Sequence, residues 1–239
     1  MRKRTKITLA VVVGVLLLGS AAAIAGPLIY RDLIAAPAAE TPTLTAEDSA
    51  LAPESTASGS DPLDAAALSG EWTVAQGSEA GYRVDEVLNG VDVTVTGRTD
   101  QVTGTLTVDG LTLQAAELTV DVASITTDSS SRDSYFRDNA LRVGQYPTAT
   151  FRLTEPIAVE TPPTAGETIE RELTGELTLA GVTQTVTFTV QARTDGTTAE
   201  IAGQIPIVFA DFGVNAPTLG FVSVEDSGYV EFQLVLGRA

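Results

Sequence analysis

The stretch from Ala116 to Leu153 reads AELTVDVASITTDSSSRDSYFRDNALRVGQYPTATFRL. Its first residues, as far as Val122, alternate strictly between apolar and polar, which is the pattern of a strand with one buried face. A Ser-rich turn and a short charged segment that contains Tyr135 and Phe136 follow. The alternation resumes in the closing residues, ATFRL. We therefore predict two strands of one sheet that are joined by a short helical cap.

The same alternation runs through most of the chain after Glu71. Hairpin-type turn signals, Asn89-Gly90, Asp109-Gly110 and Asp195-Gly196, separate the segments. About nine or ten short strands with essentially one short helix predict an all-β fold, either an antiparallel barrel or a two-sheet sandwich. Pro206 lies inside one of the alternating segments, so we expect an edge or a bulge there.

The composition excludes several classes of function. The chain has no cysteine and no histidine, and its formal net charge is −17. The missing side chains remove disulfides, Ser-His-Asp and Cys-His triads and the usual zinc ligands. A surface this acidic repels phosphate backbones, so we expect no nucleic-acid partner. We predict a protein without catalytic residues, without a metal site and without a cofactor.

The N-terminus carries a basic cluster, Arg2 to Lys6, followed by an uncharged apolar run from Ile7 to Ile24. A signal peptide cleaved near Ala25 would have this form. A retained transmembrane helix needs about 20 apolar residues, and Ile7 to Tyr30 supplies them, so we favour an uncleaved anchor. Both interpretations place the rest of the chain outside the cytoplasm, tethered to the membrane or secreted. A buried helix of a soluble protein is the third alternative.

Three regions follow from these patterns. Residues 1–34 form the anchor or signal peptide. Residues 35–69 are rich in Ala, Pro, Thr, Ser and Glu without periodicity, which predicts a disordered linker. Residues 70–239 form the folded β domain.

A dense charged cluster lies in the middle of the quoted stretch; its members are Asp128, Arg132, Asp133, Arg137 and Asp138. The cluster could bind an anionic head group, because arginine suits phosphate geometry. We favour the simpler interpretation of a capped, solvated helix with local ion pairs. The spacing does not match a calcium loop. Glu225 and Asp226 form a later acidic pair without an identifiable acid–base partner.

The apolar strand faces are the second candidate site. From the residues alone a filled core is the favoured interpretation. Many of the inward positions are nevertheless Val, Leu, Ile, Ala or Gly, which could line a smooth, inert tunnel. An apolar ligand would bind there by leaving water, at about 25 cal/mol per Å² of buried area before entropy costs.

Several motifs match a known family. In the quoted stretch they are Ser124-Ile125, Arg132-Asp133, Tyr135-Phe136 and Tyr146-Pro147 through Phe151. Two further segments are GELTLAGVTQTVTFTV (175–190) and IPIVFADFGV (205–214). Together they resemble the YceI-like family of lipid- and polyisoprenoid-binding proteins, and the resemblance covers about Glu71 to Gly237. Family members often carry histidines near the second strand and before a Gly-Val-Thr; this chain has Val87-Leu88-Asn89-Gly90 and Ala180 at those places.

The resemblance implies an eight-stranded, lipocalin-like antiparallel barrel with a helical cap and a long apolar tunnel. It also implies export and the binding of a polyprenyl-type lipid or another long-chain amphiphile, without catalysis. The residues that we predict to contact the lipid are Val120, Val122, Arg132, Phe136, Phe151, Val186 and Phe188. Arg132 could meet a polar head group or brace the cap.

Alternatives from other classes stay open. One is a hydrolase or isomerase that uses carboxylates alone. Another is a structural or adhesive β-sandwich with a filled core. A third is a carrier for a quinone or an amide-type lipid, which would use the same physics for another cargo. A homodimer is also an open possibility.

Overall fold

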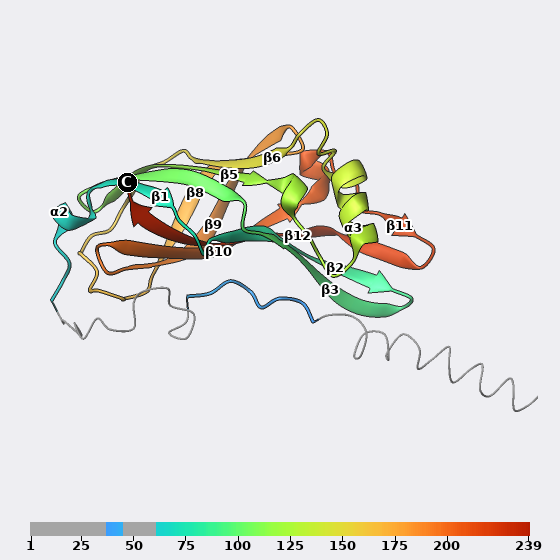
Figure 1. Ribbon diagram of the computed structural model, residues 1–239, viewed down its shortest axis with the longest axis horizontal. Helices are drawn as coiled ribbons and strands as arrows, with labels where there is room; N and C mark the ends of the chain where they lie inside the picture. Colours follow the sequence, from blue (N-terminus) through green and yellow to red (C-terminus); the bar gives the residue numbers. More distant parts are fainter. Residues whose placement is uncertain (1–36, 45–60) are drawn as a thin grey trace, which may run out of the picture.

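The computed structural model describes residues 37–44 and 61–239. The described strands form an elongated body, with helix α2 near one end and helix α3 near the other (Figure 1). The strands are β1 (Gly70–Val74), β2 (Glu79–Leu88), β3 (Val91–Thr99), β4 (Val102–Asp109), β5 (Thr112–Asp121), β6 (Thr148–Leu153), β7 (Ile157–Ala158), β8 (Ile169–Leu179), β9 (Val182–Thr194), β10 (Thr198–Val208), β11 (Thr218–Leu219) and β12 (Val222–Arg238). The helical segments are α2 (Ala65–Leu68), η2 (Val122–Ser124), α3 (Ser130–Tyr135), η3 (Phe136–Ala140) and η4 (Phe209–Phe212).

No helix within the described ranges is long and apolar enough to span a membrane. The predicted N-terminal helix from Ile7 to Tyr30 lies outside these ranges.

Eight of the described strands close into a barrel in the order β1-β4-β5-β6-β8-β9-β10-β12. Strand β12 makes the closure by pairing antiparallel with β1, where Trp72 lies opposite Arg238 and Val74 lies opposite Leu236. The predicted eight-stranded antiparallel barrel is therefore confirmed. The two-sheet sandwich is excluded, because a sandwich consists of two separate sheets packed face to face.

The hairpin of β2 and β3 extends the barrel at the α3 end. It pairs with β12 through residues 222–233, whereas β12 reaches β1 only with residues 236–238. Strand β3 also exchanges two backbone hydrogen bonds with the segment after β5, between Arg98 and Thr126, at 3.0 and 3.1 Å. Helix α3 and η3 lie at this end of the body, where we predicted the helical cap (Figure 1).

Pro206 lies where β9 and β10 have separated. Strand β10 pairs with β9 only from Ala199 to Gly203, whereas its pairing with β12 continues to Val208. Pro206 therefore belongs to the part of β10 that has lost its β9 neighbour, which confirms the predicted edge.

The hairpin turns use left-handed backbone conformations. In the β2–β3 turn Asn89 has φ 51° and Gly90 has φ 80°, as a two-residue turn of this type requires. The β8–β9 turn has the same form with Ala180 (φ 49°) and Gly181 (φ 81°). Alanine tolerates this conformation poorly, so the turn is imposed by the two long strands on either side.

Alternation divides each wall into an inner and an outer face. In β6, Ala149, Phe151 and Leu153 are buried, and the residues between them are exposed. The core cluster consists of these inward residues together with their equivalents on the other strands. The two strands of the central unit are confirmed as neighbours in one sheet, since Val120 lies opposite Ala149 and Leu118 lies opposite Phe151.

Residues 37–44 differ from the predicted linker, because they run along the outer wall of the barrel (Figure 1). We call this segment the strap. The backbone N–H of Ala39 donates to Thr96 Oγ1 at 3.0 Å, and that of Leu44, which is buried, donates to Gln191 Oε1 at 3.0 Å. Residues 61–69 are also ordered and include α2, which is capped by Asp64. Specific hydrogen bonds to the barrel hold both parts, and composition alone does not reveal such bonds.

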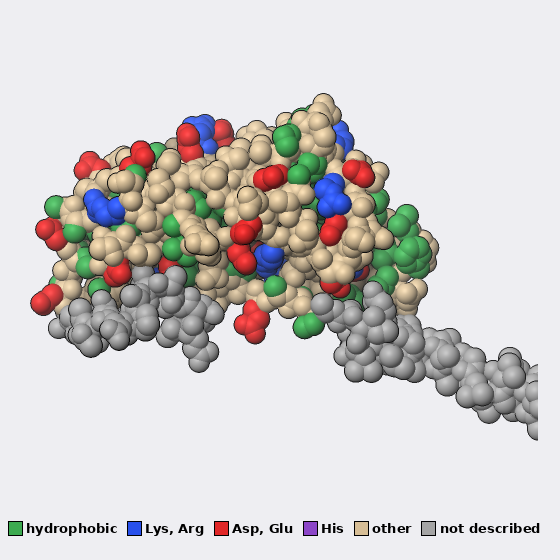
Figure 2. Space-filling model, in the orientation of Figure 1, with side chains coloured by type: hydrophobic (Ala, Val, Ile, Leu, Met, Phe, Trp, Pro, Cys, Tyr) green, Lys and Arg blue, Asp and Glu red, His purple; other side chains and the backbone are tan. Residues whose placement is uncertain are grey.

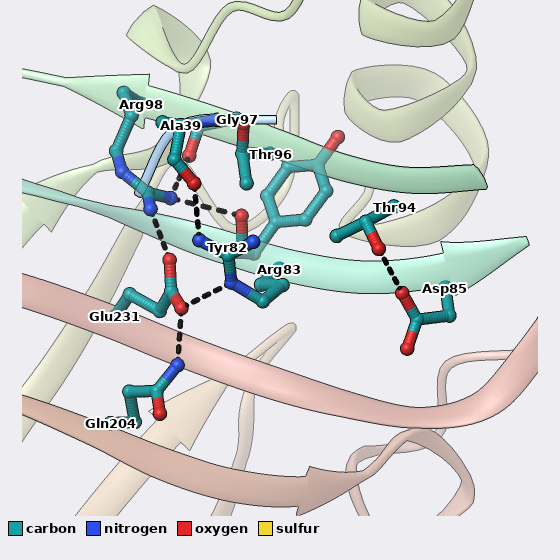
Figure 3. Close-up of polar contacts among 10 residues, drawn as sticks. All are labelled: Ala39, Tyr82, Arg83, Asp85, Thr94, Thr96, Gly97, Arg98, Gln204 and Glu231. Atoms are coloured by element: carbon teal, nitrogen blue, oxygen red, sulfur yellow. Dashed lines mark hydrogen bonds and ion pairs between the residues drawn. The ribbon is translucent and has the colours of Figure 1, made fainter. Parts of the chain in front are cut away.

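The strap lies beside a buried ion cluster (Figure 3). Glu231 is fully buried although it points outward from β12, and its carboxylate accepts from Arg83 Nε at 2.6 Å and also from Arg98. Gln204 donates a further hydrogen bond to Glu231. Arg83 Nη2 in turn donates to the carbonyl oxygen of Ala39 at 2.6 Å. The cluster therefore ties the strap to β2, β3, β10 and β12.

Candidate functional site

Three apolar cavities lie inside the barrel. The outer cavity, near α3, has a volume of about 170 Å³. The central cavity has about 80 Å³, and the inner cavity, near α2, has about 180 Å³. Each of them is several times larger than the roughly 10–15 Å³ that one buried water requires. The barrel therefore contains hollow space along its axis.

The cavities follow one another along the same strands. On β12, Val230 borders both the outer and the central cavity, Phe232 and Leu234 border the central one, and Leu236 borders the inner one. The outer and central cavities also share Ala80, Val120 and Ala149. The central and inner cavities share a second set of residues, namely Leu106, Leu113, Leu173 and Ile201. We call this row of adjacent cavities the tunnel, and we call the Ala80–Val120–Ala149 boundary the neck.

Small side chains line the neck. Ala80 on β2 and Ala149 on β6 are both buried and both face the tunnel axis. A larger residue at either position would fill the boundary between the two cavities, because protein interiors are otherwise close-packed.

The cap forms one wall of the outer cavity. Phe136 from the α3–η3 segment stacks on Tyr82 from β2, with ring centroids 4.7 Å apart. The loop after η4 forms another part of the wall, with Val214 and the exposed Asn215. The outer cavity therefore reaches the surface between the cap and this loop.

Charged groups at the outer cavity are paired with each other. Arg132 Nη2 lies 3.1 Å from Glu86 Oε1, and Arg132 Nη1 lies 2.5 Å from Asp128 Oδ1. Burial by itself would lower the pKa of Arg132, but the attraction and hydrogen bonds of Glu86 and Asp128 outweigh it and raise that pKa. Arg132 is thus a fixed cation whose charge is already compensated by two carboxylates.

Tyr82 adds an uncharged polar group. Burial raises the pKa of its hydroxyl, and the nearby Arg132 only partly opposes this effect. The hydroxyl is therefore protonated at neutral pH. A protonated phenol can both donate and accept a hydrogen bond at the edge of an apolar cavity.

The rest of the charged cluster is structural. Ser129 caps α3 by accepting from the backbone N–H of Arg132, and the pair Asp128–Arg132 lies one helical turn apart. Asp133 is buried and accepts from the backbone N–H and the hydroxyl of Thr127, at 2.9 and 2.8 Å. The favoured interpretation of a capped helix with local ion pairs matches this geometry. Glu225 and Asp226 are exposed at a register shift of β12.

Six of the seven residues that we predicted for lipid contact border the tunnel. Val120, Val122, Arg132 and Phe136 line the outer cavity, and Val120 also borders the central one. Phe151 and Phe188 line the central cavity and meet edge to face, with centroids 5.5 Å apart. Val186 lies instead beside a separate hollow of about 380 Å³, where β9 and β10 have separated.

The sequence analysis missed other residues of the tunnel. Tyr82, Ala80 and Ala149 were not singled out there as lining residues. Tyr82 could have been found from the alternation of the second strand, since Ala80, Tyr82 and Val84 share one face. For the two alanines the only signal was their small size on an inward face.

Together, the closed antiparallel barrel and its internal apolar cavities define a lipocalin-like barrel fold. The YceI-like domain family matches residues 72–236, which is the whole barrel. The chain belongs to the YceI-like family.

Solved structures share this fold. A polyisoprenoid-binding domain from Saccharophagus degradans superposes with a TM-score of 0.55 at 18% identity, covering 70% of this chain and 98% of that one. BcnA from Burkholderia cenocepacia gives a TM-score of 0.50 at 25% identity, covering 64% and 95%. No curated protein sequence matches the chain.

Proposed function

We propose that the barrel binds one long-chain lipid of the polyisoprenoid type in its tunnel. The observation that carries this proposal is the row of three adjacent apolar cavities along β12. From Val224 to Leu236 this strand would run about 40 Å at 3.3 Å per residue. Such a space suits a long, thin, apolar chain better than a compact ligand. The related fold of the S. degradans polyisoprenoid-binding domain supports the same ligand class.

The head group of this lipid would lie in the outer cavity and would be uncharged. The polar side chains of the tunnel wall at that end include the hydroxyl of Tyr82 and the pair Arg132–Glu86. A phosphate would have to compete with Glu86 and Asp128 for Arg132, and it would be repelled by both of them. An alcohol, a quinone carbonyl or an amide needs only hydrogen bonds, which the phenol can supply.

The role that we propose is binding and transport outside the cytoplasm, without catalysis. The basic start and the apolar run from Ile7 to Ile24 support export, with the segment retained as a membrane anchor. The carboxylates Glu86 and Asp128 at the outer cavity are engaged by Arg132, and this arrangement favours a structural role for them over an acid–base role.

Native mass spectrometry of the purified full chain, followed by lipid extraction, tests the proposal. We expect one long-chain lipid per protein. The matched control is Ala149→Phe, which keeps every other part of the chain but fills the neck, and it should lose the lipid. Equal lipid recovery from the two proteins would mean that the lipid is held elsewhere, and recovery from neither, after incubation with polyprenyl lipids, would refute the proposal.

A further inference from the structure

Four large apolar side chains of the described residues are prominently exposed: Val208, Leu219, Phe221 and Tyr229. Two of them, Leu219 and Phe221, lie together in the β11–β12 hairpin, with 49% and 60% of their surface exposed. Single exposed apolar residues are common on any protein. Leu219 and Phe221 differ from such isolated residues, because further apolar side chains lie beside them.

The neighbours form one row across four strand ends. Leu219 lies opposite Val222, Val222 lies opposite Leu88, and Leu88 lies opposite Val91. Directly opposite residues of antiparallel strands point to the same face, so these four side chains lie side by side. Phe221 stands next to the row, and its carbonyl oxygen accepts from Asn89 N–H at 2.8 Å. We call these five residues the apolar tip.

The apolar tip continues the inner face of the tunnel. Along β2, Leu88 follows Val84 and Glu86 on the side that lines the outer cavity, and along β12 Val222 precedes Val224 on that side. The apolar wall therefore extends beyond the outer cavity onto the hairpin ends. Apolar side chains gather in the space-filling view where β11 lies, at the same end as α3 (Figures 1 and 2).

The N-terminal part of the chain arrives at the same end. The strap begins at Pro37, which lines a pocket together with Leu88 and Val93 of the β2–β3 hairpin. Twelve residues, 25–36, separate Pro37 from the end of the run Ile7 to Ile24. Twelve residues span at most about 40 Å even when fully extended. A membrane that held this run would therefore lie within reach of the apolar tip.

We propose that the apolar tip docks onto a lipid bilayer and places the outer cavity at the membrane surface. The occupant is the interfacial layer of the bilayer, which the apolar tip enters with Leu219 and Phe221 foremost. The charges closest to the apolar tip along the strands are acidic, with Asp92 on β3 and Glu225 on β12, both exposed. Docking therefore relies on apolar burial and is weakened by anionic lipids. The contact would serve the proposed function by giving a lipid an apolar path from bilayer to tunnel.

The absence of cysteine makes a direct test simple, because one introduced cysteine is a unique labelling site. We would label Phe221→Cys with an environment-sensitive dye in the full chain, reconstituted in phosphatidylcholine vesicles. The matched control is Ala158→Cys on β7, an exposed position at the opposite end of the barrel. We expect emission at shorter wavelength, and quenching by brominated lipids, for Phe221→Cys alone.

A polar environment at both positions would overturn the proposal, and so would equal quenching at both, because the domain would then lie on its side. An increase in quenching when phosphatidylglycerol replaces half of the phosphatidylcholine would overturn the account of the charges. The double variant Leu219→Ser/Phe221→Ser should slow lipid uptake from vesicles several-fold while it leaves the capacity of the tunnel unchanged. Docking is separable from lipid binding, since the Phe221→Cys label should still respond when Ala149→Phe blocks the tunnel.

Discussion

Filling the neck should separate the outer cavity from the central and inner cavities. Ala149 is 9% exposed, lies opposite Val120, and borders both the outer and the central cavity. A phenylalanine at this position places a ring on the tunnel axis. The ligand chain can then occupy only the outer cavity, of about 170 Å³, and loses the central and inner ones, of about 80 and 180 Å³.

The magnitude follows from the chain that is excluded. Each buried methylene contributes about 0.8 kcal/mol, so excluding only about four of them, less than one isoprene unit, already costs about 3 kcal/mol, or roughly a hundredfold in Kd. The sharper expectation concerns chain length. Wild-type affinity should rise with every added isoprene unit until the inner cavity is filled, whereas the affinity of Ala149→Phe should stop rising once the outer cavity is full.

Isothermal titration calorimetry with a series of prenyl alcohols measures both quantities. Thr148→Leu is the matched control, because Thr148 is the preceding residue of β6 and is exposed. Overpacking costs about 1–3 kcal/mol of stability, so retained binding of the shortest alcohols serves as the test that Ala149→Phe is folded. The reasoning fails if Ala149→Phe keeps the wild-type dependence on chain length, or if Thr148→Leu loses it.

Three further predictions concern stability and selectivity. Glu231→Ala should lower the free energy of unfolding by about 3 kcal/mol in urea titrations, because it removes a fully buried carboxylate and leaves two partly buried guanidinium groups without it; a loss below 1 kcal/mol would show that the cluster is not strongly coupled. Glu86→Gln should leave Arg132 with Asp128 alone and improve the binding of a prenyl phosphate relative to the matching alcohol in competition assays, and an unchanged ratio would contradict the charge argument. Burial alone would raise the pKa of Asp195, but hydrogen bonds from Thr198 and Thr197 outweigh it and lower that pKa. The stabilising contribution of Asp195 is therefore present above the pKa of the unfolded chain and is lost as the pH falls through the pKa of the folded protein. Asp195→Ala should therefore cost about 1 kcal/mol at pH 7 and less near pH 3 in denaturant titrations, and an equal cost at both pH values would refute the assignment.

The strand pattern could be predicted from the sequence because one face of each strand is buried. Ala149, Phe151 and Leu153 alternate with exposed residues, so their period marks the strand and its inner face together. The closure of the barrel could not be predicted in this way. It depends on Trp72 meeting Arg238, a pairing between the two ends of the domain that leaves no local signal.

The candidate site could likewise be predicted only in part from the sequence. Val120 and Phe136 could be selected as apolar residues of the central unit, and both line the outer cavity. The neck could not be predicted, because an alanine makes space only in relation to the residues across the barrel. The cluster at Glu231 was missed for a related reason: its outward direction predicts exposure, but Arg83, Arg98 and the strap cover it.

The separation of β9 from β10 at Pro206 bears on self-association. A strand that has lost its neighbour presents free backbone groups to which another polypeptide can add, and this is a common route to aggregation. Proline has no N–H, so this position of β10 offers an incoming strand no donor. The gap in the barrel wall is thus a poorer template for the addition of further chains at this position.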